Sequence, residues 1–251
     1  MIKVFLDPGH GGADRANRGP TGYIEADGVL KISLLLEKEL LSTGAFEVGL
    51  SRRVDTTLGL TERGQAAAKF GAQLFISEHT NASGASPNTT ARGCDVYESV
   101  DLKDEILGAK MSKAIAAALG IPDRGVHHRE SVKYPGEDYY TVIDSAQDAG
   151  IPHILLIESA FHDHRADEAL LKQDANLLKI AQAQASVICE FFGVKYPVNK
   201  EMTVDEAIDI WVAAGVIGDP AGMKNDFATG QFRPDRYKAF LIKSAKHIMK
   251  G

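Results

Sequence analysis

A regular alternation of short apolar runs with longer helix-like segments is the feature that most constrains the fold of this chain. Five runs have the length and the β-branched content of strands. They are residues 2–7, 46–51, 74–77, 94–99 and 153–159. The last run, HILLIES, contains an unbroken apolar stretch, which is typical of a strand covered on both faces.

Helix-like segments lie between these runs. They are residues 28–42, 61–71, 101–119 and 167–192. The last segment carries an apolar stripe at helical spacing. Asp101 suits a helix N-cap, and Gly120 suits a helix end. The alternation favours an α/β fold in which a mostly parallel, twisted sheet is flanked by helices.

A change in composition near residue 193 divides the chain. The stretch GVKYPVNKEM contains Gly, Pro and Asn after a long helical segment, which is typical of a linker. A capping-box pattern begins at Thr203, and a further helix is expected at about 234–249. We therefore expect a large domain over 1–194, a linker over 195–202 and a small C-terminal helical unit over 203–251.

Charge and hydropathy exclude several partners and locations. The formal net charge is −6, which offers no basic surface for nucleic acid. No segment approaches the roughly 18 to 20 apolar residues of a membrane helix, so we expect no membrane insertion. The N-terminus, MIKVFLDPGHGG, lacks the pattern of a signal peptide, which predicts synthesis in the cytoplasm without one. Cys94 and Cys189 are interpreted as small buried apolar residues.

Side chains that bind metals follow three of the predicted strands. His10 follows the first strand, His79 the third, and Glu158 ends the fifth, while Glu25 lies just ahead of the first helix. Ligands of open α/β sheets gather at the carboxyl ends of strands. Two imidazoles and a carboxylate suit a hydrolytic zinc site, with Glu158 as the base or as a partner that stabilises the transition state. Their long, irregular spacing leaves open that His10 is a turn residue and Glu158 a salt-bridge partner.

Four blocks of sequence carry a resemblance to a known family. They are LDPGHGG with the Glu that follows it, residues 48–82, RGCDVYES and IPHILLIESAF. In order and spacing, over about residues 1–193, the chain resembles the zinc-dependent N-acetylmuramoyl-L-alanine amidases of the family called amidase 3. The resemblance implies a Zn²⁺ cofactor and peptidoglycan as the partner.

The resemblance also implies the roles of individual residues. Zinc would be bound by His10, Glu25 and His79, and Glu158 would be the catalytic carboxylate. The reaction of that family is cleavage of the amide between the lactyl group of muramic acid and the L-alanine of the stem peptide. Zinc polarises the carbonyl and lowers the pKa of water towards about 7, and Glu158 moves the proton.

Four further residues are expected to contact the substrate. Asn81 belongs to the block Ser-x-His-x-Asn, which resembles the family pattern. Arg129, Tyr139 and Tyr140 belong to the long segment 121–150, which we expect to form a wall of the cleft. These side chains would contact glycan or peptide, although a plain surface loop is an equally good interpretation of the segment.

The chain departs from the family pattern at a few positions. Glu78 stands where the family usually has an apolar residue, and we expect a local salt bridge or partial exposure for it. His162 and His164, in FHDHR, are interpreted as ordinary polar loop residues. The motif HHRE offers a rival zinc motif, His127-x-x-Glu130, in what we expect to be a polar loop without a strand leading into it.

Two alternative functions remain at this stage. One is a catalytically inactive module that binds the cell wall, and the other is a zinc peptidase that cleaves stem peptides through residues 127–130. For an amidase without a signal peptide, we favour a phage endolysin that reaches the wall after release by a holin or by lysis, over an enzyme of a sporulating mother cell. The C-terminal unit would serve wall targeting, docking or a homodimer contact.

Overall fold

The chain divides into two compact units, Met1–Tyr196 and Pro197–Gly251. The computed structural model describes residues 1–84, 87–102, 105–196, 208 and 219–230. Most of the expected linker over 195–202, and the helices expected from Thr203 and over 234–249, lie outside the described residues. In the second unit the structure describes helix α8, Pro220–Thr229. Asp219 caps it by accepting a hydrogen bond from the Gly222 N–H at 2.9 Å.

The first unit is built on a sheet whose described strands follow the order β2-β1-β3-β6-β4-β5. The strands are β1 (Ile2–Pro8), β2 (Phe46–Leu50), β3 (Leu74–Asn81), β4 (Cys94–Glu98), β5 (Asp123–His128) and β6 (Ile154–Phe161). Neighbouring strands pair in parallel, except that β4 runs antiparallel to β6. The predicted α/β fold with a mostly parallel sheet is therefore confirmed.

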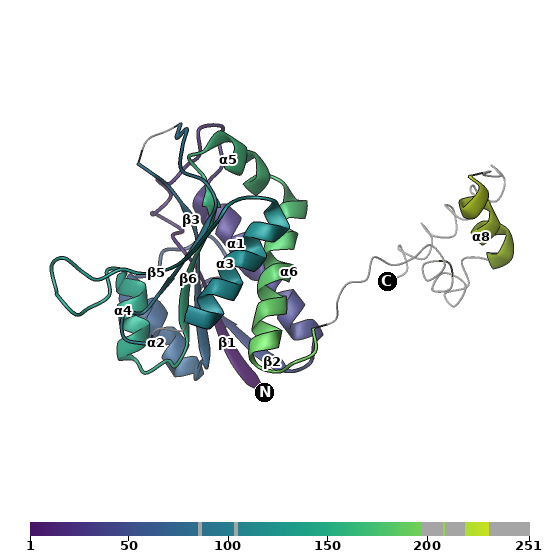
Figure 1. Ribbon diagram of the computed structural model, residues 1–251. Coiled ribbons are helices and arrows are strands. Elements are labelled where there is room, and N and C mark those ends of the chain that lie inside the picture. Colours follow the sequence, from purple (N-terminus) through teal and green to yellow (C-terminus); the bar gives the residue numbers. More distant parts are fainter. Residues whose placement is uncertain (85–86, 103–104, 197–207, 209–218, 231–251) are drawn as a thin grey trace. The chain divides into compact units, whose positions relative to one another are not determined.

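Helices cover both faces of the sheet (Figure 1). The helices are α1 (Glu25–Ser42), α2 (Leu60–Phe70), α3 (Glu105–Leu119), α4 (Thr141–Asp148), α5 (Arg165–Leu171) and α6 (Asp174–Phe191). Helices α1 and α3 both pack against α6 on one face, whereas α2 packs against α4 on the other. The first unit therefore folds into three layers with the sheet in the middle.

Alternation along the strands divides the core into two clusters. On β6, Leu155 and Ile157 point to the face of α1, α3 and α6, whereas Ile154 and Leu156 point to the face of α2 and α4. This explains the unbroken apolar stretch, because both sets of side chains are buried. The same alternation places Glu158 on the face of α2 and α4. Cys94 and Cys189 are free and buried, as predicted.

The structure corrects several of the predicted element boundaries. Helix α1 begins at Glu25, so this residue belongs to the helix instead of preceding it. The segment 167–192 forms two helices, α5 and α6, that are separated at Lys172–Gln173. Asp101, the expected N-cap of the segment 101–119, lies in a turn, and the described part of α3 begins at Glu105.

Sequence patterns missed two elements within 121–150. Strand β5 was expected to be a polar loop, and it is polar because it lies at the edge of the sheet, where its residues are half-buried or exposed. Helix α4 is short, and it buries Val142, Ile143 and Ala146 against α2 and the sheet. Neither element is long enough for its apolar period to stand out.

No helix within the described part of the chain combines the length and the apolar character that crossing a membrane would require.

Glu78 is fully buried on the face of α6, contrary to the expectation of a salt bridge or partial exposure. Its Oε2 accepts a hydrogen bond from Gln184 Nε2 at 3.1 Å, and burial raises its pKa to about 8. Glu78 Oε1 and Gln184 Oε1 have no hydrogen-bond partner among the described residues. A proton on Glu78 therefore supplies a donor where an ionised carboxylate would add only another acceptor.

Glu78→Gln is expected to remove a loss of stability that the wild-type protein suffers as pH rises. The unfolded carboxyl has a pKa of 4.5 and the folded one about 8, so between these values only the folded state keeps the proton. The free energy of unfolding of the wild type then falls relative to Glu78→Gln, by up to about 1.4 kcal/mol per pH unit. Urea unfolding of both proteins from pH 5 to pH 8 measures this, and a constant difference would contradict it.

Candidate metal centre and active site

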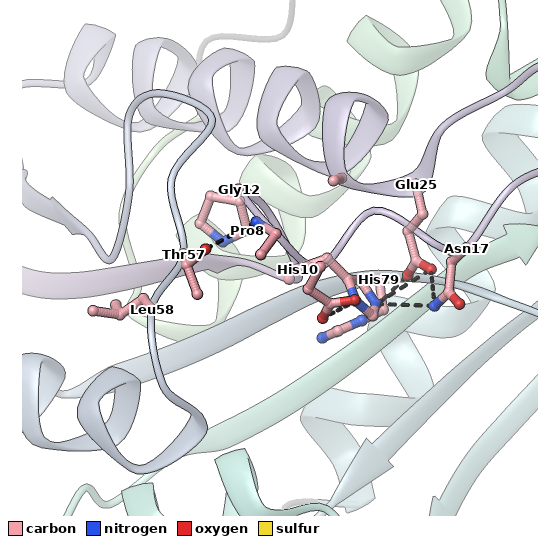
Figure 2. Close-up of polar contacts among 12 residues, drawn as sticks. Pro8, His10, Gly12, Asn17, Glu25, Thr57, Leu58 and His79 are labelled. Carbon is pink, nitrogen blue, oxygen red and sulfur yellow. Dashed lines mark hydrogen bonds and ion pairs between the residues drawn. The ribbon is translucent and has the colours of Figure 1, made fainter.

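Three side chains from separate elements converge at the carboxyl ends of β1 and β3 (Figure 2). His10 lies in the loop after β1, Glu25 opens α1, and His79 lies on β3. Each offers a ligand atom, and these atoms all lie within 4.8 Å of one another. Among the described residues, no other group of three or more His, Cys, Asp or Glu side chains has this metal-binding geometry. The structure thus brings together the three predicted ligands.

Glu25 is the centre of this cluster. Its Oε1 accepts a hydrogen bond from the Thr80 N–H at 2.9 Å and lies 3.2 Å from His79 Nδ1. Its Oε2 lies 3.3 Å from His10 Nε2. Burial opposes ionisation, but the hydrogen bonds and charges of both histidines outweigh it and hold the pKa of Glu25 well below its ordinary value. Glu25 is therefore an anion at neutral pH, as a metal ligand must be.

The pKa of His10 is shifted by the same interaction in the opposite direction. Burial lowers its pKa, but Glu25 and Asp14 outweigh burial and raise the pKa to about 9. The imidazole therefore carries a proton in the protein without a cation. A cation that takes Nε2 as a ligand must displace this proton, so metal binding and proton release are coupled here.

The backbone at His10 adopts a conformation that a side chain seldom tolerates. The φ angle of His10 is 60°, in the left-handed region. All other residues with positive φ in the described part of the chain are glycines. A Cβ on Gly9 would overlap the His79 ring, so only glycine lets β1 end this close to the second histidine. Such strain persists only where surrounding contacts enforce it.

Two buried arginines provide those contacts. Arg52 donates to the Pro8 carbonyl oxygen at 2.9 Å and to that of Gly9 at 2.7 Å. Arg63 donates to the carbonyl oxygens of Pro8 at 2.8 Å and His10 at 2.9 Å. The guanidinium groups thus hold three successive carbonyls of the loop in place, which sets the direction of the His10 side chain.

Asp14 and Asn17 complete the surroundings of His10, and sequence reasoning missed both. Asp14 Oδ2 lies 2.8 Å from His10 Nδ1, which orients the ring so that Nε2 faces Glu25. Asn17 Nδ2 donates to Glu25 Oε2 at 2.8 Å and lies 3.2 Å from His10 Nε2 (Figure 2). Both follow His10 within one loop. The sequence signal that could have identified them is a polar side chain four or seven residues after a candidate ligand.

Glu158 lies beside this cluster because of strand register. It pairs with His79 of β3 on one side and with Asp95 of β4 on the other. Its side chain is buried, and Oε2 has no hydrogen-bond partner among the described residues. Burial first, and then the carboxylates of Glu25 and Asp95, raise its pKa well above the ordinary value. A buried carboxyl group with a free lone pair is suited to accept and return a proton.

Comparison with known proteins identifies the family. The Amidase_3 family, described as N-acetylmuramoyl-L-alanine amidase, matches residues 4–190. The chain belongs to this amidase family.

Relatives of this amidase come from bacteria and from a phage. It is 30% identical to the amidase CwlM of Bacillus licheniformis over 195 residues, which cover 77% of this chain and 70% of CwlM. It is 34% identical to LytC of Bacillus subtilis (strain 168), covering 72% of this chain but 33% of LytC. It is 29% identical to the endolysin of Bacillus phage SPP1, covering 76% and 66%.

Solved structures share the fold. The catalytic domain of the amidase CwlV from Bacillus (Paenibacillus) polymyxa var. colistinus superposes with a TM-score of 0.66 and 29% identity. The match covers 78% of this chain and all of that domain. An amidase from Clostridium difficile 630 gives a TM-score of 0.67 at 24% identity. These comparisons confirm the predicted amidase family, fold class and enzyme class.

His162 differs from the polar loop residue that we expected. It is buried after β6, and its Nδ1 lies 3.0 Å from Thr80 Oγ1 and 3.8 Å from Glu25 Oε2. Its ring stacks on that of Tyr23 at 6.3 Å. His162 therefore supports the Glu25 side of the cluster. His164 precedes α5 with its Nδ1 4.0 Å from Asp167.

The rival motif at residues 127–130 is not assembled. His127 lies on β5, where its Nε2 is 2.9 Å from Asp95 Oδ1. Glu130 Oε1 instead accepts a hydrogen bond from the Gly136 N–H at 2.6 Å. The predicted loop without a strand was wrong, and His127 and Glu130 are absent from the metal-binding geometry found among the described residues.

The residues predicted to contact substrate lie on β3 and on the loop after β5. Asn81 Nδ2 donates to Asp95 Oδ2 at 2.9 Å, and its Oδ1 accepts from the Ala82 N–H. Both ends of this amide are engaged within the protein. Arg129 lies on the Tyr139 ring at 3.4 Å from its centroid, and the ring of Tyr140 packs on Tyr97. Their contact with a substrate remains a prediction.

Asp14→Asn is expected to weaken metal binding about 10- to 100-fold, because His10 loses the carboxylate that orients its ring. The affinity for Zn²⁺ is measured by competition with a chromogenic chelator. Asp174→Asn, at an exposed aspartate on α6 that pairs with Lys31, serves as the control and should bind Zn²⁺ like the wild type. Unchanged affinity in Asp14→Asn would show that Asp14 does not orient His10.

Proposed function

We propose that this amidase hydrolyses bacterial peptidoglycan at the amide between the lactyl group of N-acetylmuramic acid and the L-alanine of the stem peptide. The observation that carries the proposal is the register of β3 and β6, which sets Glu158 directly beside the cluster of His10, Glu25 and His79. The family match over residues 4–190 supports the same activity. A module that only binds walls would need neither the ligands nor the unpartnered carboxyl group.

His10, Glu25 and His79 are the residues that would hold Zn²⁺. Two imidazoles and one ionised carboxylate, with ligand atoms within 4.8 Å of one another, fit the donor set of a hydrolytic zinc site. When bound, zinc supplies a Lewis acid that polarises the scissile carbonyl and lowers the pKa of water towards about 7.

Glu158 carries the proton through the reaction. It accepts a proton from the water whose oxygen bonds to the carbonyl carbon, and it donates that proton to the alanine nitrogen as the C–N bond breaks. Amide nitrogen is a poor leaving group unless it is protonated, so the same carboxyl group must act first as base and then as acid. Its burial and its unpartnered Oε2 support this assignment.

Two regions beside the cluster would contact the substrate. A pocket of about 280 Å³ borders His10 and His79 and is lined by Leu58 and Val142, which suits an apolar part of the substrate. On the side of β4 and β5, we propose that Arg129, Tyr139 and Tyr140 contact glycan or peptide. Asn81, a further predicted contact, would act there through Asp95.

The biological setting is part of the same proposal. Similarity to the SPP1 endolysin supports a phage lysis enzyme that meets the wall after release by a holin or by lysis. Similarity to LytC and to the sporulation-specific amidase of Bacillus subtilis supports a host enzyme as the second candidate. Expression in a bacterium with and without a holin tests the role as a phage lysis enzyme, which predicts holin-dependent lysis.

A homodimer through residues 203–251 would be tested by sedimentation of the whole chain.

Glu158→Gln is expected to keep Zn²⁺ at one equivalent and to lose most of the activity, by a factor of about 10² to 10⁴. The amide has nearly the same shape as the carboxyl group but cannot accept the proton. Metal content and the release of L-alanine amino groups from purified walls measure both effects. Glu78→Gln, the same change on the opposite face of the sheet, is the matched control and should stay active. Full activity in Glu158→Gln would contradict the assignment of the base.

Digestion of purified walls separates the three candidate activities. The amidase is expected to create new L-alanine amino groups on intact glycan, and a chelator should abolish them until Zn²⁺ is returned. Unchanged walls would favour a binding module, and cleavage within the stem peptide would favour a peptidase.

A further inference from the structure

Carboxylates surround the centre of the cleft. Glu25 and Glu158 lie at the cluster itself, Asp14 lies against His10, and Asp95 pairs with Glu158 across the strands. In the substrate of the proposed function, the residue that follows L-alanine is a glutamate whose free carboxylate lies one residue from the scissile amide. Binding such an anion requires a cationic side chain whose N–H groups are open to a ligand.

Two of the basic side chains near Glu158 are already engaged. Arg124 Nε donates to both oxygens of Asp95, at 2.9 Å and 2.8 Å. His127 Nε2 lies 2.9 Å from the same carboxylate. Asp95 is buried, so the Arg124 guanidinium serves to neutralise it and leaves little charge for a ligand, and the His127 ring is held by the same carboxylate.

Arg129 is different, because it forms no ion pair with a carboxylate of the described chain. Its guanidinium lies on the Tyr139 ring at 3.4 Å from the centroid, and 5.8 Å from the centroid of Tyr140. The guanidinium also hydrogen-bonds the Tyr140 side chain. Stacking on an aromatic face satisfies the flat side of a guanidinium, and a guanidinium has five N–H donors, so N–H groups of Arg129 remain for a charge-assisted contact with a carboxylate.

The tyrosines connect Arg129 to Glu158. The ring of Tyr140 packs on that of Tyr97 at 4.9 Å, and Tyr97 lies on β4 two residues after Asp95, the strand partner of Glu158. Burial raises the pKa of Tyr97, Asp95 and Glu158 raise it further, and Tyr140 and Arg129 lower it, so Glu158 and Arg129 both lie close enough to act on this one ring. Arg129 therefore lies at the same end of the cleft as the catalytic carboxyl group.

The backbone holds Arg129 in this position. The Tyr139 N–H donates to the Arg129 carbonyl oxygen at 2.8 Å, and Glu130 and Asp138 form a bridge one step further along the loop. Arg129 directly follows β5 and Tyr140 directly precedes α4, so both ends of the loop are anchored in regular structure. The backbone that carries the Arg129 side chain is therefore held in a fixed position.

We propose that Arg129 binds the free carboxylate of the glutamate that follows L-alanine, and so makes the amidase selective for stem peptides in which this group is a carboxylate and not a primary amide. This proposal rests on the proposed function. It names the chemical group that the cleft recognises next to the scissile bond.

A pair of soluble muropeptides that differ only at this group tests the proposal. One carries the glutamate carboxylate and the other carries the primary amide, and kcat/KM is measured from new L-alanine amino groups. The wild type is expected to prefer the carboxylate at least about tenfold, as for a charge-assisted bidentate contact. Arg129→Gln should reduce this ratio to about one, mainly through the carboxylate substrate, and Arg129→Lys should retain part of it.

Lys133→Gln is the matched control, because it removes a positive charge from the same loop, where Lys133 lies over the Tyr134 ring at 4.9 Å. Its ratio should equal that of the wild type. An equal fall of the ratio in Lys133→Gln, or an equal loss on both substrates in Arg129→Gln, would overturn the proposal. Equal cleavage of both substrates by the wild type would overturn it and leave the proposed function intact, whereas cleavage of neither would overturn the proposed function.

Discussion

The site depends above all on two buried guanidinium groups that hold the loop after β1. Arg52 and Arg63 bond the carbonyl oxygens of three successive residues, and Arg63 also pairs with Asp7 at 2.7 Å. Asp7 in turn accepts hydrogen bonds from Ser51 Oγ and from Ser77 Oγ, which tie β1 to the strands on either side. The strained backbone of His10 persists because this network of hydrogen bonds holds the carbonyl groups of the loop in one conformation.

Two glutamates a short distance apart acquire opposite properties from their surroundings. Glu25 faces two histidines and a backbone N–H, which favour its anion, whereas Glu158 is buried between carboxylates and has a free oxygen. The first is suited to hold a cation and the second to carry a proton. Environment, and not residue type, separates these roles, as it does in other enzymes that use paired carboxyl groups.

The reversal of β4 against β6 gives the cleft its second wall. Because β4 is antiparallel, its first residues lie beside the end of β6, and Asp95 meets Glu158 there. Strand β5 runs parallel to β4 and leads directly into the loop that begins at Arg129. One change of direction in the sheet thus places a guanidinium and a group of tyrosines on the same side of the site as Glu158, the proposed catalytic residue.

The sequence by itself determined the strand–helix alternation and the apolar β6, since burial periodicity and strand ends are local properties. Its four family-like blocks nominated His10, Glu25, His79 and Glu158 as site residues. It could not determine that Asp14 and Asn17 turn back onto His10, that residues 123–128 join the sheet as an edge strand, or that Glu78 is buried against Gln184. Those features depend on which segments become neighbours, and only the tertiary structure decides that. A polar edge strand lacks the apolar alternation by which a strand is recognised in sequence. Whether a carboxyl group is buried depends on the residues that pack on it, which the local sequence does not specify.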